Sequence, residues 1–239
     1  MKPVILFDLG NTLVRYYRRS EFAGILGRSI AAVADVLSEA GLPVAAGEEL
    51  GRRADAERYE SIDHAVRPLE GRLGRVFGFD PARVEAELVD RAARAFLAET
   101  FALAHRYEDV VPVLSKLKER RVRTAIISNT PWGSPARLWR EELGRHGLTD
   151  LVDRAVFCGE VGYRKPHPAI FHYALERLGV GPEACLFVGD DPRWDVAGPQ
   201  AVGIEAVLID RLGEWPEADA PRIRTLEGLL DQSSRGSEG

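Results

Sequence analysis

One carboxylate with an unusual neighbour stands near the start of this chain, in the stretch VILFDLGNT. Asp8 follows a short apolar run, so it is expected where a buried strand emerges into a loop. A carboxylate in such a place can act as a nucleophile or bind a divalent cation. Two residues later, where a second carboxylate could transfer protons, the chain has Gly10.

Further polar groups follow the later apolar runs of the chain. Each has an ordinary structural explanation by itself, as a turn or a helix N-cap. Together they provide a hydroxyl, an amide, an ammonium and an acidic cluster, which are groups that bind and activate a phosphoryl group. In chain order they are Ser128, Asn129 and Thr130, then Lys165, then Asp190 and Asp191 with Asp195 one helical turn beyond.

The elements that must position these groups are short, continuously apolar strands. Continuous apolar character is typical of strands that are buried on both faces of a parallel sheet. Helical patterns at 110–120 and 168–180 lie between them. We therefore predict a doubly wound parallel α/β sheet, whose polar strand ends meet at one edge. The expected strands are 4–7, 122–128, 153–158, 185–189 and 204–209.

A long helical segment interrupts the predicted sheet after its first strand. Four helical patterns occur before the next strand, at 21–40, 46–60, 64–77 and 81–99. We expect an α/β core made of residues 1–15 and 103–239 and an all-helical cap at 16–102, with hinges near 14–20 and 100–106. The polar tail, 232–239, is expected to be disordered.

These motifs together resemble those of a haloacid dehalogenase-superfamily hydrolase with a helical cap of the C1 type, inserted after the first strand. The resemblance covers essentially the whole chain and is carried by residues that occur in the expected order. They are Asp8 in FDLGNT, Ser128 in IISN, Lys165 in RKPHP, and Asp190 with Asp195 in GDDPRWD.

The resemblance implies a Mg²⁺-dependent phosphatase of small phosphorylated metabolites, with Asp8 as the nucleophile that forms an aspartyl-phosphate. It places Mg²⁺ on Asp8, Asp190 and the carbonyl of Gly10, and gives Asp195 the role of orienting Lys165 or a metal-bound water. The role of Asp191 stays open. The phosphate would be bound by Leu9, Gly10, Ser128, Asn129 and Lys165.

Gly10 departs from the pattern, because most phosphatases of this superfamily have a second Asp there as general acid and base. The carbonyl that binds the metal is retained, whereas the proton-transfer group is lost. We therefore expect a slow phosphatase, or one whose leaving groups need little protonation. The structural alternative is that a glycine is needed for a turn with positive φ.

Residue types also bear on four other functions. A 2-haloacid dehalogenase needs no metal, so the acidic cluster near Asp190 disfavours it. A phosphonatase with a cap Lys is disfavoured because residues 16–102 contain no Lys. The helical insert and the length disfavour a phospho-accepting signalling domain. A catalytically weakened member, which binds a phosphorylated ligand or a protein partner for regulation, stays open on the strength of Gly10.

The composition argues against some classes of partner but does not identify a substrate. The net charge of −5 over 239 residues predicts no nucleic-acid or anionic-membrane partner, and two cysteines without metal spacing suit a cytoplasmic protein. The residues from Arg15 to Arg19 and Trp132 either contact the substrate or serve only the hinge and turn that contain them. The oligomeric state is not predicted.

Overall fold

The computed structural model describes residues 2–231 and has a six-stranded parallel sheet at its centre. The predicted tail, 232–239, lies outside the described residues. The strand order is β5-β4-β1-β6-β7-β8, so the first strand is central and the chain extends the sheet in both directions from it. The strands are β1 (Val4–Phe7), β4 (Arg123–Ser128), β5 (Arg154–Phe157), β6 (Cys185–Gly189), β7 (Glu205–Ile209) and β8 (Arg222–Ile223).

Both faces of the sheet are covered, which explains the continuously apolar strands. In β1, Ile5 and Phe7 face the core on one side, and Val4 and Leu6 face a second core on the other. Helices α5 (Val110–Glu119) and α6 (Ala136–Arg145) contribute to the first core, and α8 (Pro168–Leu178) contributes to the second. The fold is thus the predicted doubly wound α/β sheet, and all five predicted strands are confirmed. The shorter helices are α7 (Cys158–Val161), α9 (Gly198–Gln200) and α10 (Gly228–Asp231).

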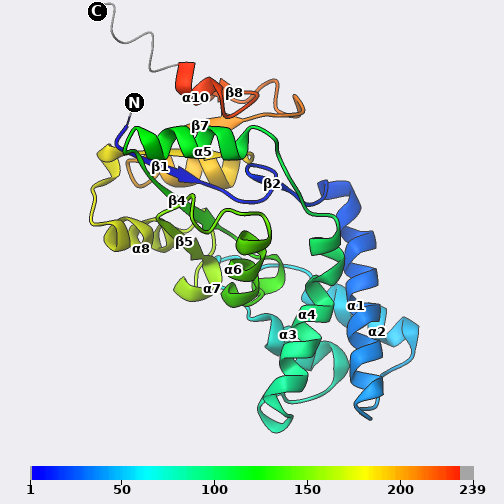
Figure 1. Cartoon of the computed structure of the whole chain (residues 1–239). Helices are drawn as coiled ribbons and strands as arrows, with labels where there is room; N and C mark the ends of the chain where they lie inside the picture. Colours follow the sequence, from blue (N-terminus) through cyan, green and yellow to red (C-terminus); the bar gives the residue numbers. More distant parts are fainter. Residues whose placement is uncertain (1, 232–239) are drawn as a thin grey trace, which may run out of the picture.

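The helices of residues 22–102 gather beyond one end of the sheet (Figure 1). The chain passes to them through β2 (Val14–Arg15) and returns through β3 (His105–Arg106), and these two strands form a separate antiparallel pair. The two longest helices, α1 and α4, pack on each other. The four helices are α1 (Phe22–Glu39), α2 (Gly47–Glu57), α3 (Leu69–Phe77) and α4 (Ala86–Ala102).

The third helix begins later than its sequence pattern suggests. The pattern covers 64–77, but α3 begins at Leu69, directly after Pro68. Residues 64–68 are not helical: His64 has a left-handed backbone conformation, with φ of 61°, and Ala65 forms an antiparallel bridge with Tyr163 of the α/β core. The segment that looked helical therefore joins the helical region to the core.

A tight turn of the core meets this same segment. Trp132 has a left-handed backbone conformation, with φ of 54°, and Gly133 follows with φ of 63°. A side chain at Gly133 would overlap the carbonyl oxygen of Arg67, so only glycine allows this approach. Within residues 2–231, none of the helices has the length and apolar character needed to cross a membrane.

Candidate active site

A buried ion-pair triad lies at the carboxyl end of β1. The Lys165 Nζ lies 2.6 Å from Asp8 Oδ1 and 2.7 Å from Asp195 Oδ1, and the lysine is only 1% exposed. Asp8 follows β1, while Asp195 belongs to a π-helical turn, Pro192–Ala197, that follows β6. Since β1 and β6 are neighbours in the sheet, their carboxyl ends bring these distant residues together.

Burial changes the pKa values of the groups in this triad. Desolvation raises the pKa of Asp8 to about 6; Lys165 opposes the rise, and the nearby Asp195 adds to it. Burial lowers the pKa of Lys165, but its ion pairs with Asp195 and Asp8 outweigh this effect and raise it. One ammonium therefore sits between two carboxylates, of which Asp8 is close to its titration point near neutral pH.

The residues after β4 hold the lysine segment. Asn129 Oδ1 accepts a hydrogen bond from the Lys165 backbone N–H at 2.7 Å, and Asn129 Nδ2 donates to the Lys165 carbonyl at 3.1 Å. Ser128 is buried beside it, and its hydroxyl donates to the Asn129 carbonyl at 3.2 Å. Both side chains line the same cavity as Asp8.

A group of three acidic residues could hold a divalent cation. Oxygen atoms of Asp8, Asp190 and Asp195 lie within 4.8 Å of one another, and such hard ligands suit Mg²⁺. Asp195 already accepts from Lys165 through Oδ1 and from the Asp191 backbone N–H through Oδ2. Both oxygens of Asp195 are thus bonded within the protein itself. Asp191 caps the π-helical turn by accepting from the backbone N–H groups of Arg193 and Trp194.

Gly10 leaves open space beside the carboxylate. A Cβ atom built there would lie 3.8 Å from Tyr16 Cδ2 and 4.0 Å from Asp8 Oδ2, which are ordinary van der Waals distances. Its φ lies outside the left-handed region, which is occupied by Asn11 instead, with φ of 56°. The interpretation that a glycine is needed here for a positive φ is therefore wrong. Leu9 is fully buried, and a hydrogen bond from its backbone lowers the pKa of Asp8.

A cavity of about 710 Å³ extends from the triad toward the helical region. Its walls include side chains that the sequence did not single out, because their approach depends on how the loop between α2 and α3 folds back. Trp132 also lines the cavity and packs on Phe96, with ring centroids 5.1 Å apart. The unforeseen lining residues of this loop are Arg58, Glu60, Ser61, Ile62 and His64.

The residues from Arg15 to Arg18 line two cavities. Tyr16 lines the large cavity, and Arg15 and Arg18 line a smaller one of about 60 Å³. Tyr17 and Asp190 line both cavities. The side chain of Arg19 lies outside the described residues. The buried Tyr16 hydroxyl finds no hydrogen-bond partner within the described part of the chain.

Comparison with known proteins identifies the family. The sequence profile of the haloacid dehalogenase-like hydrolases matches residues 2–203. The glyceraldehyde 3-phosphate phosphatase of Methanopyrus kandleri is 31% identical over 218 residues, which cover 88% of this chain and 85% of that protein. The phosphoserine phosphatase of Thermus thermophilus is 37% identical over 183 residues, covering 74% and 69%. The structure of a 2-haloacid dehalogenase from Pseudomonas syringae is similar, with a TM-score of 0.70 and 26% identity over 99% of this chain and 100% of that one. The chain therefore belongs to the haloacid dehalogenase-like hydrolase family.

Proposed function

We propose that the protein is a Mg²⁺-dependent phosphatase of small phosphorylated metabolites that acts through an aspartyl-phosphate on Asp8. The observation that carries this proposal is the position of Lys165, 2.6 Å from Asp8 and 2.7 Å from Asp195, with Asp190 in the same acidic group. The two phosphatases named above support it, because each matches more than two thirds of this chain.

In the first step, Asp8 attacks the phosphorus atom and the bond from phosphorus to the leaving oxygen breaks. Lys165 balances the negative charge of the attacking carboxylate and of the phosphoryl oxygens. The Ser128 hydroxyl and the Asn129 backbone N–H, at the end of β4, would donate hydrogen bonds to those oxygens. Asp195 keeps the ammonium beside Asp8. In the second step, water attacks the phosphorus atom, which releases phosphate and restores Asp8.

Asp8, Asp190 and the carbonyl of Gly10 would hold the metal ion. When bound, Mg²⁺ supplies positive charge that lets two anions approach each other. It also favours the ionised form of Asp8, because a nearby cation opposes the desolvation that otherwise raises its pKa.

We further propose that residues 16–102 act as a cap over a core of residues 1–15 and 103–239. The large cavity has walls from both parts, which supports a site that closes around the substrate and excludes water. Gly10 supplies no group to protonate the leaving oxygen, so we expect slow turnover of alkyl phosphates.

A panel of phosphorylated metabolites tests this function, assayed for phosphate release with Mg²⁺ and with EDTA. Asp8→Asn, which cannot form the aspartyl-phosphate, is the control. We expect turnover that EDTA and Asp8→Asn both abolish. Binding of phosphate esters without turnover would instead support the regulatory alternative.

The second candidate activity is 2-haloacid dehalogenation, since a dehalogenase has a similar structure. The group formed by Asp8, Asp190 and Asp195 disfavours it, because dehalogenation needs no metal. Release of halide from a 2-haloacid, unaffected by EDTA and without activity on any phosphate ester, would contradict the proposed phosphatase.

A further inference from the structure

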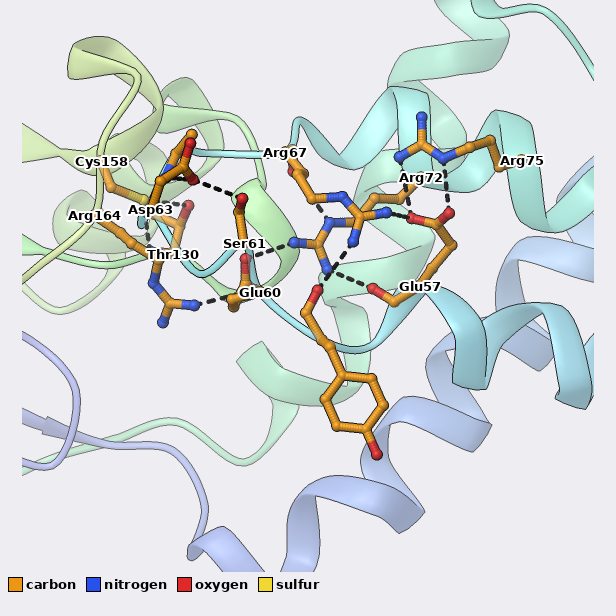
Figure 2. Close-up of polar contacts among 12 residues, drawn as sticks. Glu57, Glu60, Ser61, Asp63, Arg67, Arg72, Arg75, Thr130, Cys158 and Arg164 are labelled. Atoms are coloured by element: carbon orange, nitrogen blue, oxygen red, sulfur yellow. Dashed lines mark hydrogen bonds and ion pairs between the residues drawn. The ribbon is translucent and has the colours of Figure 1, made fainter.

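The loop of residues 58–67, between α2 and α3, is held in place by a buried arginine. Arg72 of α3 is fully buried, and its guanidinium donates to the carbonyl oxygen of Glu57 at 2.6 Å and to that of Arg67 at 3.2 Å. It also donates to Glu60 Oε2 at 2.5 Å. Figure 2 shows this arrangement, with the Arg72 guanidinium among the loop's oxygen atoms. Because a buried guanidinium needs all of these partners, the position of the Glu60 carboxylate is tightly defined.

The other oxygen of Glu60 faces the α/β core. Glu60 Oε1 lies 3.3 Å from Arg164 Nη1 (Figure 2), and the two side chains are 27% and 15% exposed. The backbone adds a second link, since the Arg164 N–H donates to the His64 carbonyl at 3.0 Å. The Val66 N–H donates to the Gly162 carbonyl at 2.8 Å. The loop therefore fixes both the backbone and the side chain of Arg164.

Arg164 precedes Lys165 in the chain, and its side chain contacts Trp194, which precedes Asp195. It directly precedes Lys165, whose backbone is held on its other side by Asn129. Its guanidinium lies 5.3 Å from the centroid of the Trp194 ring, and Trp194 directly precedes Asp195. A displacement of Arg164 would thus be passed to the ammonium and to the carboxylate that orients it.

We propose that Glu60 is a positioning residue, which acts through Arg164 to hold Lys165 and Asp195 in place beside Asp8. The inference rests on the proposed phosphatase function. It assigns to the helical segment a part in the chemical step, in addition to covering the cavity. Misplacement of a reacting group by about 1 Å can slow a reaction on the order of 10²-fold, so loss of this link should be visible in kcat.

The test compares Glu60→Gln with Glu141→Gln, which removes the same charge from another ion pair between the two parts of the chain. Arg94 of α4 donates to both oxygens of Glu141 on α6, at 2.6 and 2.9 Å, and neither residue lines the cavity. We expect Glu60→Gln to lower kcat by roughly ten- to a hundredfold, with little change in KM. The factor should be the same for acetyl phosphate and p-nitrophenyl phosphate, and Glu141→Gln should keep the wild-type kcat.

Arg164→Met supplies a second variant that leaves the contact between Glu60 and Arg72 intact. If Glu60 acts only through Arg164, the double variant will be no slower than Arg164→Met alone. The inference is wrong if Glu60→Gln keeps full kcat, if the two effects multiply, or if only KM for the larger substrate rises, which would mean direct substrate contact. A wild-type protein that is inactive on every phosphate ester would instead refute the proposed function itself.

Discussion

Gly10→Asp should convert the protein into a faster phosphatase for alkyl esters. The backbone at Gly10 needs no glycine, and the Cβ position is free of close contacts, so the substitution is expected to fold normally. General acid catalysis typically contributes about 10²–10⁴-fold, which corresponds to about 2.7–5.4 kcal/mol of barrier at 1.36 kcal/mol for each factor of ten.

The gain is expected at the lower end of this range. The new Cβ atom would lie 4.0 Å from Asp8 Oδ2, so a second carboxylate there adds like charge beside a group whose pKa is already raised to about 6. Less Asp8 is then ionised near neutral pH, whereas the new carboxyl must be protonated to donate, so the improvement should pass through a maximum as the pH is raised. We therefore expect an increase of about 10²-fold in the first turnover of an alkyl phosphate.

Single-turnover assays with an alkyl phosphate and with p-nitrophenyl phosphate separate proton donation from other effects. The aryl ester, whose leaving group needs little protonation, should change little. Gly10→Asn, of nearly the same shape but without an acid, is the matched control and should give no gain. If the wild type already cleaves alkyl esters as fast as aryl esters and Gly10→Asp adds nothing, the reasoning about the missing acid fails.

Three further outcomes follow from the buried charges and the unpartnered hydroxyl. Lys165→Met leaves Asp8 and Asp195 without their cation and should lower the free energy of unfolding by about 3–5 kcal/mol in urea titrations near neutral pH, with partial recovery at low pH; an unchanged midpoint would contradict the triad. The folded-state pKa of Asp8, about 6, exceeds the ordinary value of 3.8, so its contribution to metal-free stability is full below that ordinary value and is lost as pH rises through about 6. Mg²⁺ should therefore raise Tm more above pH 6 than below it, and an equal rise at both would argue against Asp8 as a ligand. Tyr16→Phe removes a buried hydroxyl that has no partner among the described residues and should raise the free energy of unfolding by up to about 1 kcal/mol, whereas a loss of stability would reveal an unrecognised hydrogen bond.

The convergence of the site could be predicted because it depends on sheet topology. Apolar runs define the parallel strands, and parallel strands deliver whatever follows them to one edge. Asp8, Asn129 and Asp195 each follow a strand, so the sequence alone places them near one another. The open space at Gly10 could not be predicted, because it depends on backbone torsion and on where the Tyr16 ring lies.

The loop that contacts Arg164 could not be predicted for a different reason. Its main links to the core are backbone hydrogen bonds, from Val66 to Gly162 and from Arg164 to His64, and these carry no side-chain signal. The helical periodicity of 64–77 even favoured the wrong structure for its first residues, because α3 begins only after Pro68. The strands β2, β3 and β8 were not predicted, because two residues are too few to form an apolar pattern.

The pairing of β2 with β3 limits how the helical region can move. Val14 pairs with Arg106 and Arg15 with His105, so the outgoing and returning chains form a two-stranded ribbon where they pass between the two parts. Such a ribbon flexes about a single axis more readily than it shears. A rotation of the helices about this ribbon would move the rim of the cavity farther than the tyrosines beside the ribbon. It would require release of the Glu60 contact together with the backbone hydrogen bonds of the loop and the ion pair between Arg94 and Glu141.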